Sequence, residues 1–143
     1  MKNSVSLAGI LLAAGIVAGA MSSAAVAADD PFAQPGAVEN AQAAAAAGAK
    51  NQLPAQIDKV TTLQDVSADG ATLINRYVLA VDASKMNLAV FAEKMEAQLK
   101  GICDQKQTAA IISHGGTYRY MFKSTDDQEL GDFTIDKAAC ASR

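Results

Sequence analysis

The stretch DASKMNLAVFAEKMEAQLKGICD, residues 82–104, decides the fold because it predicts a long helix with one buried face. Its apolar residues recur at spacings of three and four, while Glu93, Lys94 and Gln98 take the other side. Ser84 or Asn87 could cap the start of this helix. The apolar stripe predicts core packing and consists of Leu88, Phe91, Ala92, Met95, Leu99 and Ile102.

Two predicted hairpins flank the helix. Before it, apolar runs at about 60–67 and 73–81 are separated by Asp69-Gly70, and Asp-Gly between such runs is a strong hairpin signal. The first run also has apolar residues three apart, which suits a helix, but its β-branched residues favour a strand that could be bulged. After the helix, TYRYMFKS (117–124) alternates strictly, TDDQ supplies a turn, and ELGDFTI (129–135) returns.

Residues 105–116 connect the long helix to the second hairpin. They could form a short helix or the lead-in to a strand, and the Gly115-Gly116 pair favours a helical turn that stops there. Two hairpins cannot bury their faces alone. We therefore predict an α+β fold: a four-stranded antiparallel sheet packed on one long helix and a short helical turn, in a single domain over residues 53–143.

The N-terminus predicts a secretory signal peptide over residues 1–27. Lys2 precedes an uncharged apolar run from Val5 to Ala20, and Ala25-Val26-Ala27 has the small-x-small pattern of a cleavage site. The alternative is a retained transmembrane helix, but the run is short and broken by glycine. No cysteine lies near the cleavage site, so the sequence predicts no lipid attachment and no stable membrane anchor after cleavage.

Residues 28–52 predict a flexible linker rich in alanine and proline. The run ENAQAAAAAGAK favours helix intrinsically but offers no apolar face to bury, and a short isolated helix is marginal in water. A mobile, partly helical spacer is therefore expected, with a docking helix as the alternative.

Charge and export restrict the partners. Only Lys2 among the 12 basic and 15 acidic residues lies in the leader, so the mature chain is one unit more negative than the −3 of the whole chain. A mildly acidic domain without a basic run argues against binding to nucleic acid or to an anionic membrane surface. The predicted location is periplasmic or secreted.

The chain has two cysteines, Cys103 and Cys140, and an exported protein with two cysteines favours a disulfide between them. Such a bond would fasten the end of the chain to the long helix. A free thiol, an intermolecular bond and metal ligation are the alternatives. Without a CxxC pair or a second histidine, the sequence predicts neither a redox motif, a metal site nor a cofactor.

His114 is the only histidine, and its closeness in sequence to Cys103 suggests a catalytic pair. A disulfide would remove that partner, and a histidine at a helix end usually caps backbone carbonyls. Ser113 and Ser124 lack the surroundings of a catalytic serine. The acidic run STDDQELGD lacks the ligand spacing of a calcium loop and predicts a solvated turn. No catalytic residue is therefore predicted.

The combination of LPAQID, TTLQDV, a strand with Tyr77, GIC, YRYMF and a final cysteine resembles small exported proteobacterial proteins. It is similar to the quorum-sensing-regulated virulence factor family, over about Leu53 to Cys140. The resemblance implies export, an α+β domain and a link to virulence or secretion.

These observations lead to a non-enzymatic exported protein that acts by contact with another protein or the envelope. The alternative is an inhibitor or immunity-type protein that blocks an extracytoplasmic enzyme through the loop KSTDDQELGD. A hydrolase that uses His114 is the third hypothesis.

Overall fold

The computed structural model describes residues 30–142, so the predicted signal peptide lies outside the described residues. The elements are α1 (Ala37–Lys50), β1 (Ala55–Gln56), β2 (Thr61–Asp69), β3 (Thr72–Leu79), α2 (Leu88–Leu99), α3 (Lys106–Ser113), β4 (Thr117–Ser124), β5 (Glu129–Ile135) and α4 (Lys137–Ala141). Two 3₁₀ turns, η1 (Ala83–Lys85) and η2 (Lys100–Asp104), flank α2.

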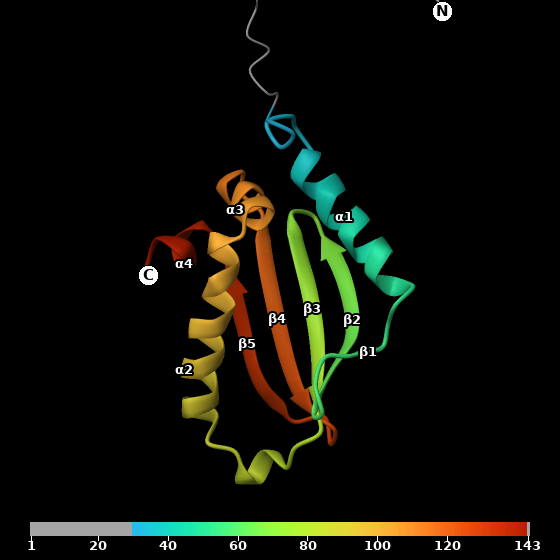
Figure 1. Ribbon diagram of the computed structural model, residues 1–143, viewed down its shortest axis with the longest axis vertical. Coiled ribbons are helices and arrows are strands. Elements are labelled where there is room, and N and C mark those ends of the chain that lie inside the picture. Colours follow the sequence, from blue (N-terminus) through green and yellow to red (C-terminus); the bar gives the residue numbers. More distant parts are fainter. Residues whose placement is uncertain (1–29, 143) are drawn as a thin grey trace, which may run out of the picture.

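The five strands form one sheet in the order β1-β2-β3-β4-β5 (Figure 1). Both predicted hairpins are confirmed: Asp69 pairs with Thr72 across the Gly70 turn, and β4 pairs antiparallel with β5. The predicted bulge in the first strand is also present, between Leu63 and Asp65.

The prediction of a four-stranded, fully antiparallel sheet is wrong in two respects. The two-residue strand β1 adds a fifth strand beside β2. In addition, β3 and β4 are parallel, in a register that places Leu73 beside Tyr118 and Tyr77 beside Phe122. The physical reason is that α2 carries the chain back along the sheet, so that β4 starts at the same end as β3 (Figure 1).

The helices α1 and α2 cover the same face of the sheet. Phe91 of α2 contacts the rings of Phe122 and Phe133. Ala46 of α1 packs in a second cluster with Val66 and Leu73. Because the register puts Leu73 and Phe122 on one face, both helices share that layer, α1 over β2 and α2 over β5 (Figure 1).

The prediction of a flexible linker over residues 28–52 is wrong for Ala37–Lys50, which form α1 and pack on β2 and β3. The buried residues Val38, Gln42 and Ala46 are four apart and share one side of the helix. These three side chains are a valine, a glutamine and an alanine, so the buried side of the helix gives only a weak hydrophobic pattern in the sequence. Alanine nevertheless allows a helix to approach a sheet closely.

Gln42 fixes α1 to the sheet by hydrogen bonds as well as by packing. Its side chain is 1% exposed, and Nε2 donates to the backbone carbonyls of Ala71 and Thr117, at 3.2 and 3.3 Å. One amide thus connects α1 to the β2–β3 turn and to the first residue of β4.

We expect Gln42→Met, which keeps the length and helix propensity of the side chain, to lower the free energy of unfolding by about 1–3 kcal/mol. The reason is that the variant removes the two hydrogen bonds by which the buried amide joins α1 to the carbonyls of Ala71 and Thr117. Urea denaturation measures the change. The control is Asn40→Met on the exposed side of α1, which should stay within about 0.5 kcal/mol of the unmodified protein. Equal stability of the two variants would contradict the role of Gln42.

Candidate functional site

A groove between α2 and the β1–β2 loop lies over the middle strands of the sheet. It encloses about 250 Å³. One wall is α2, the opposite wall is the β1–β2 loop, and the floor is formed by the C-terminal halves of β3 and β4. The lining residues are Ile57, Asp58, Thr61, Tyr77, Leu79, Phe91, Met95, Gln98, Leu99 and Phe122.

The floor of the groove is aromatic because parallel pairing places Tyr77 directly beside Phe122. Their rings stack with centroids 4.9 Å apart and an interplanar angle of 13°. Phe91 of α2 meets Phe122 edge-on at 5.6 Å. Burial raises the pKa of Tyr77, so its hydroxyl stays neutral at physiological pH. The floor is therefore a rigid, uncharged surface.

The groove wall formed by α2 is only partly buried. Asn87 accepts a hydrogen bond from the backbone N–H of Val90, at 3.2 Å, and so caps the start of the helix, as the sequence predicts. Phe91, Met95 and Leu99 face the sheet as predicted, yet no residue of α2 is fully buried. The prediction of core packing is wrong for Leu88, which is 44% exposed in the first turn of the helix. The apolar stripe therefore contributes to the core and, at the same time, presents an apolar wall to the groove.

The opposite wall is the β1–β2 loop, whose conformation is fixed by Asp58. Its Oδ1 accepts hydrogen bonds from the backbone N–H groups of Val60 and Thr61, at 2.9 and 2.8 Å. The Val60 amide, together with the Thr61 side chain, lowers the pKa of this carboxyl, so it stays charged. Ile57 beside it is 58% exposed. The loop thus holds a large apolar side chain in solvent at the edge of the groove.

The uncovered face of the sheet has a different character, because its cations are paired with neighbouring acids. Arg76 binds Asp65 at 2.9 Å. Arg119 binds Asp132 through both carboxylate oxygens, and this contact lowers the pKa of Asp132. This face therefore carries paired charges interspersed with apolar side chains such as Val78 and Met121.

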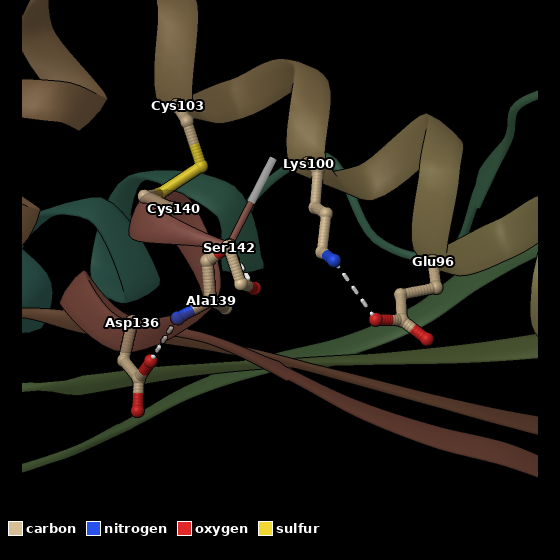
Figure 2. Close-up of a disulfide and its surroundings, with 7 residues drawn as sticks. All are labelled: Glu96, Lys100, Cys103, Asp136, Ala139, Cys140 and Ser142. Atoms are coloured by element: carbon tan, nitrogen blue, oxygen red, sulfur yellow. Dashed lines mark hydrogen bonds and ion pairs between the residues drawn. A yellow bond between two sulfur atoms is a disulfide. The ribbon is translucent and has the colours of Figure 1, made fainter.

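The predicted disulfide is present in the structure and lies at the C-terminal end of α2. Cys103 of η2 and Cys140 of α4 are bonded, with their Cα atoms 5.7 Å apart (Figure 2). Asp136 caps α4 by accepting from the backbone N–H of Ala139 at 2.9 Å. Cys103 is 7% exposed and belongs to the same core cluster as Leu99, a groove residue. The bond therefore fastens one end of the groove wall to the chain terminus.

The other predicted site residues do not join the groove. His114 lies at the end of α3, where Nδ1 is 2.9 Å from the carbonyl of Ala110, which is the helix-end role that the sequence predicts. Its second contact, the carboxylate of Asp30 at 2.8 Å from Nε2, has no signal in the sequence. The neighbouring Ser113 hydroxyl donates to the same Ala110 carbonyl.

The acidic run closes into a short turn. Backbone hydrogen bonds join Asp127 to Ser124 and Ser124 to Gln128, so only four residues connect β4 and β5. The Ser124 hydroxyl donates to Asp126, and Lys123 pairs with Asp127 at 2.9 Å. The turn is therefore short and exposed, and its hydrogen bonds and ion pair hold it in place.

Two further observations concern the described residues as a whole. Between Asp30 and Ser142, no group of three or more histidine, cysteine or carboxylate side chains is placed to hold a metal ion. None of the helices in this part of the chain is both long and apolar enough to span a bilayer.

Comparison with solved structures shows the fold. A candidate secreted protein of Pseudomonas aeruginosa, PA3611, is 18% identical, with a TM-score of 0.63 over 72% of this chain and 92% of its own. The type 2 secretion system pilotin EpsS of Vibrio vulnificus is 16% identical, with a TM-score of 0.60 over 72% and 91%. The pilotin AspS of Vibrio cholerae is 19% identical, with a TM-score of 0.57 over 72% and 92%.

Neither a family profile nor a curated protein sequence matches the chain. Membership of the quorum-sensing-regulated virulence factor family therefore stays a prediction. The solved structures establish a shared mixed α+β fold at low sequence identity.

We expect the protein purified from the periplasm to contain no free thiol, and mass spectrometry before and after reduction measures this. In the chain-entropy model, closing a loop of 37 residues stabilises the fold by about 4 kcal/mol. The double variant Cys103→Ser, Cys140→Ser should therefore unfold at a clearly lower urea concentration. The control is Ser113→Ala, at the exposed end of α3, which should unfold close to the unmodified protein. Two free thiols before reduction would contradict the bond.

Proposed function

We propose that this chain is an exported, non-enzymatic protein that acts by binding a partner protein through the groove between α2 and the β1–β2 loop. The observation that carries the proposal is a groove with the partly exposed ring of Tyr77 on its floor, stacked on the buried Phe122, beside the 58% exposed Ile57. Aromatic and aliphatic side chains that surround a small depression are typical of the anchor positions of protein interfaces.

The size of the groove supports a protein partner over a small molecule. Its volume of about 250 Å³ is below the roughly 300–1,000 Å³ usual for small-molecule pockets. It is large enough for a few apolar side chains of a partner segment. Asp58 is the one charged residue in its lining, so recognition of a charged group is limited to one edge.

Two pilotins of type 2 secretion systems share the fold, which supports a partner that belongs to a secretion apparatus of the cell envelope. The disulfide between Cys103 and Cys140 supports folding in an oxidising compartment outside the cytoplasm. The predicted leader at residues 1–27 agrees with this location.

Site-specific crosslinking in the native cell tests the proposal. A photoreactive amino acid is placed at Ile57 or Gln98 in the groove and, as a control, at Thr134 on the uncovered face. We expect a crosslink to one envelope protein from both groove positions and none from Thr134. Equal crosslinking from the two faces, or none from the groove, would contradict the proposal.

Affinity for the crosslinked partner then tests the groove directly. Because Ile57 is largely exposed, Ile57→Asp should leave the fold intact while it charges an apolar contact. We expect binding to weaken at least about tenfold, which corresponds to about 1.4 kcal/mol. The matched control is Val90→Asp on α2, which is 42% exposed and outside the groove lining. Equal losses in both variants would argue for a general effect of charge.

A further inference from the structure

The carboxylate of Asp58 is the only charged group in the lining of the groove between α2 and the β1–β2 loop. Asp58 is exposed, and hydrogen bonds from the Val60 N–H and the Thr61 side chain lower the pKa of its carboxyl. It therefore stays negative at neutral pH. Among residues 30–142, no lysine, arginine or histidine forms an ion pair with it. The groove thus offers one negative charge without a counter-charge.

The Asp58 carboxylate can accept a further hydrogen bond from outside the molecule. Its Oδ1 accepts from the backbone N–H groups of Val60 and Thr61, at 2.9 and 2.8 Å, and the Thr61 side chain is a third donor. A carboxylate has about four acceptor positions, so a position remains for a partner. Because the loop already holds the group in place, binding a donor requires no ordering of Asp58.

The floor of the same groove suits the stem of a long basic side chain. The ring of Tyr77 is partly exposed and is held by stacking on Phe122, with centroids 4.9 Å apart. An aromatic face attracts a cation, and a guanidinium also stacks on it. Lysine and arginine place their methylene groups along apolar surface and keep the charged head at a polar edge. An apolar floor with one carboxylate at its edge matches both parts of such a side chain.

We infer that the groove accepts an arginine or lysine side chain from a segment of the partner protein. The stem lies on Tyr77, the charged head binds Asp58, and apolar residues beside it in the segment contact Ile57 and Met95 on the two walls. The inference rests on the proposed function, because it names the chemistry that the same groove selects. A neutral residue at this position would leave Asp58 without a counter-charge, and an acidic one would be repelled, so Asp58 determines specificity.

Two capped tripeptides test the inference without the natural partner. One is acetyl-leucine-arginine-leucine amide, and the other has citrulline, which is neutral and nearly the same shape, in place of arginine. NMR titration of the purified, ¹⁵N-labelled protein measures binding. We expect the arginine peptide to shift the amide signals of Asp58, Thr61 and Tyr77, and the citrulline peptide to bind about fivefold more weakly or less. Equal affinity of the two peptides, or no shift with either, would overturn the inference.

Variants assign the selectivity to Asp58. Asp58→Asn removes the charge but keeps a side-chain oxygen that can accept from Val60 and Thr61, so the loop is retained and the two peptides should bind equally. Glu93→Gln is the matched control, because it removes one carboxylate from an exposed position of α2 outside the groove lining. The arginine peptide should keep its advantage there. The same advantage in Asp58→Asn would show that the carboxylate does not select the partner.

A second copy of this chain is the other possible source of a basic residue, because Lys59 follows Asp58 in the loop and is exposed. Sedimentation velocity of the purified protein decides between them, and we expect a monomer. A dimer that dissociates in Lys59→Gln would place a second copy in the groove and overturn the separate partner. Arginine selectivity without an envelope crosslink would contradict the proposed function alone, whereas a groove crosslink without arginine selectivity would overturn only this inference.

Discussion

The parallel pairing of β3 with β4 is the constraint on which the rest of the structure depends. It requires a connection that travels the length of the sheet, and α2 and α3 provide it. The pairing brings Tyr77 beside Phe122 at the centre of the sheet. The helix α2, which carries the chain back along the sheet, then has to lie over these rings, and its Phe91 meets Phe122 edge-on. Core and groove therefore arise from one topological feature.

The groove exists because two helices share one face of the sheet without meeting over its middle. The alanine-rich α1 packs over β2, and α2 packs over β5. Between them, the ring of Tyr77 is only partly covered, and the β1–β2 loop held by Asp58 forms the second wall. An interface can form at such a place at little energetic cost, because its apolar surface is already held rigid by the core beneath it.

Both ends of the described chain are fixed to the connection between β3 and β4. The disulfide joins α4 to η2 at the end of α2, and His114 at the end of α3 holds Asp30. The connection is therefore more than a spacer between strands: it forms one wall of the groove and anchors both ends of the described chain. The two anchors differ in chemistry, since one is a covalent bond and the other is a contact between polar side chains.

The sequence by itself determined the local elements, which are the Asp-Gly hairpin, the β4–β5 hairpin, the amphipathic α2 and the helix ended by Gly115. It also predicted the disulfide between Cys103 and Cys140, which is present in the structure. These follow from periodicity, turn chemistry and cysteine count, which act between near neighbours or through composition. Only the tertiary structure decided the parallel β3–β4 pairing, the docking of α1 through Gln42, the groove, and the contact of Asp30 with His114. Each of these joins residues far apart in the chain. Their interaction energy depends on packing and hydrogen bonding in three dimensions, and an alanine tract or a lone histidine carries no local signal of its partner.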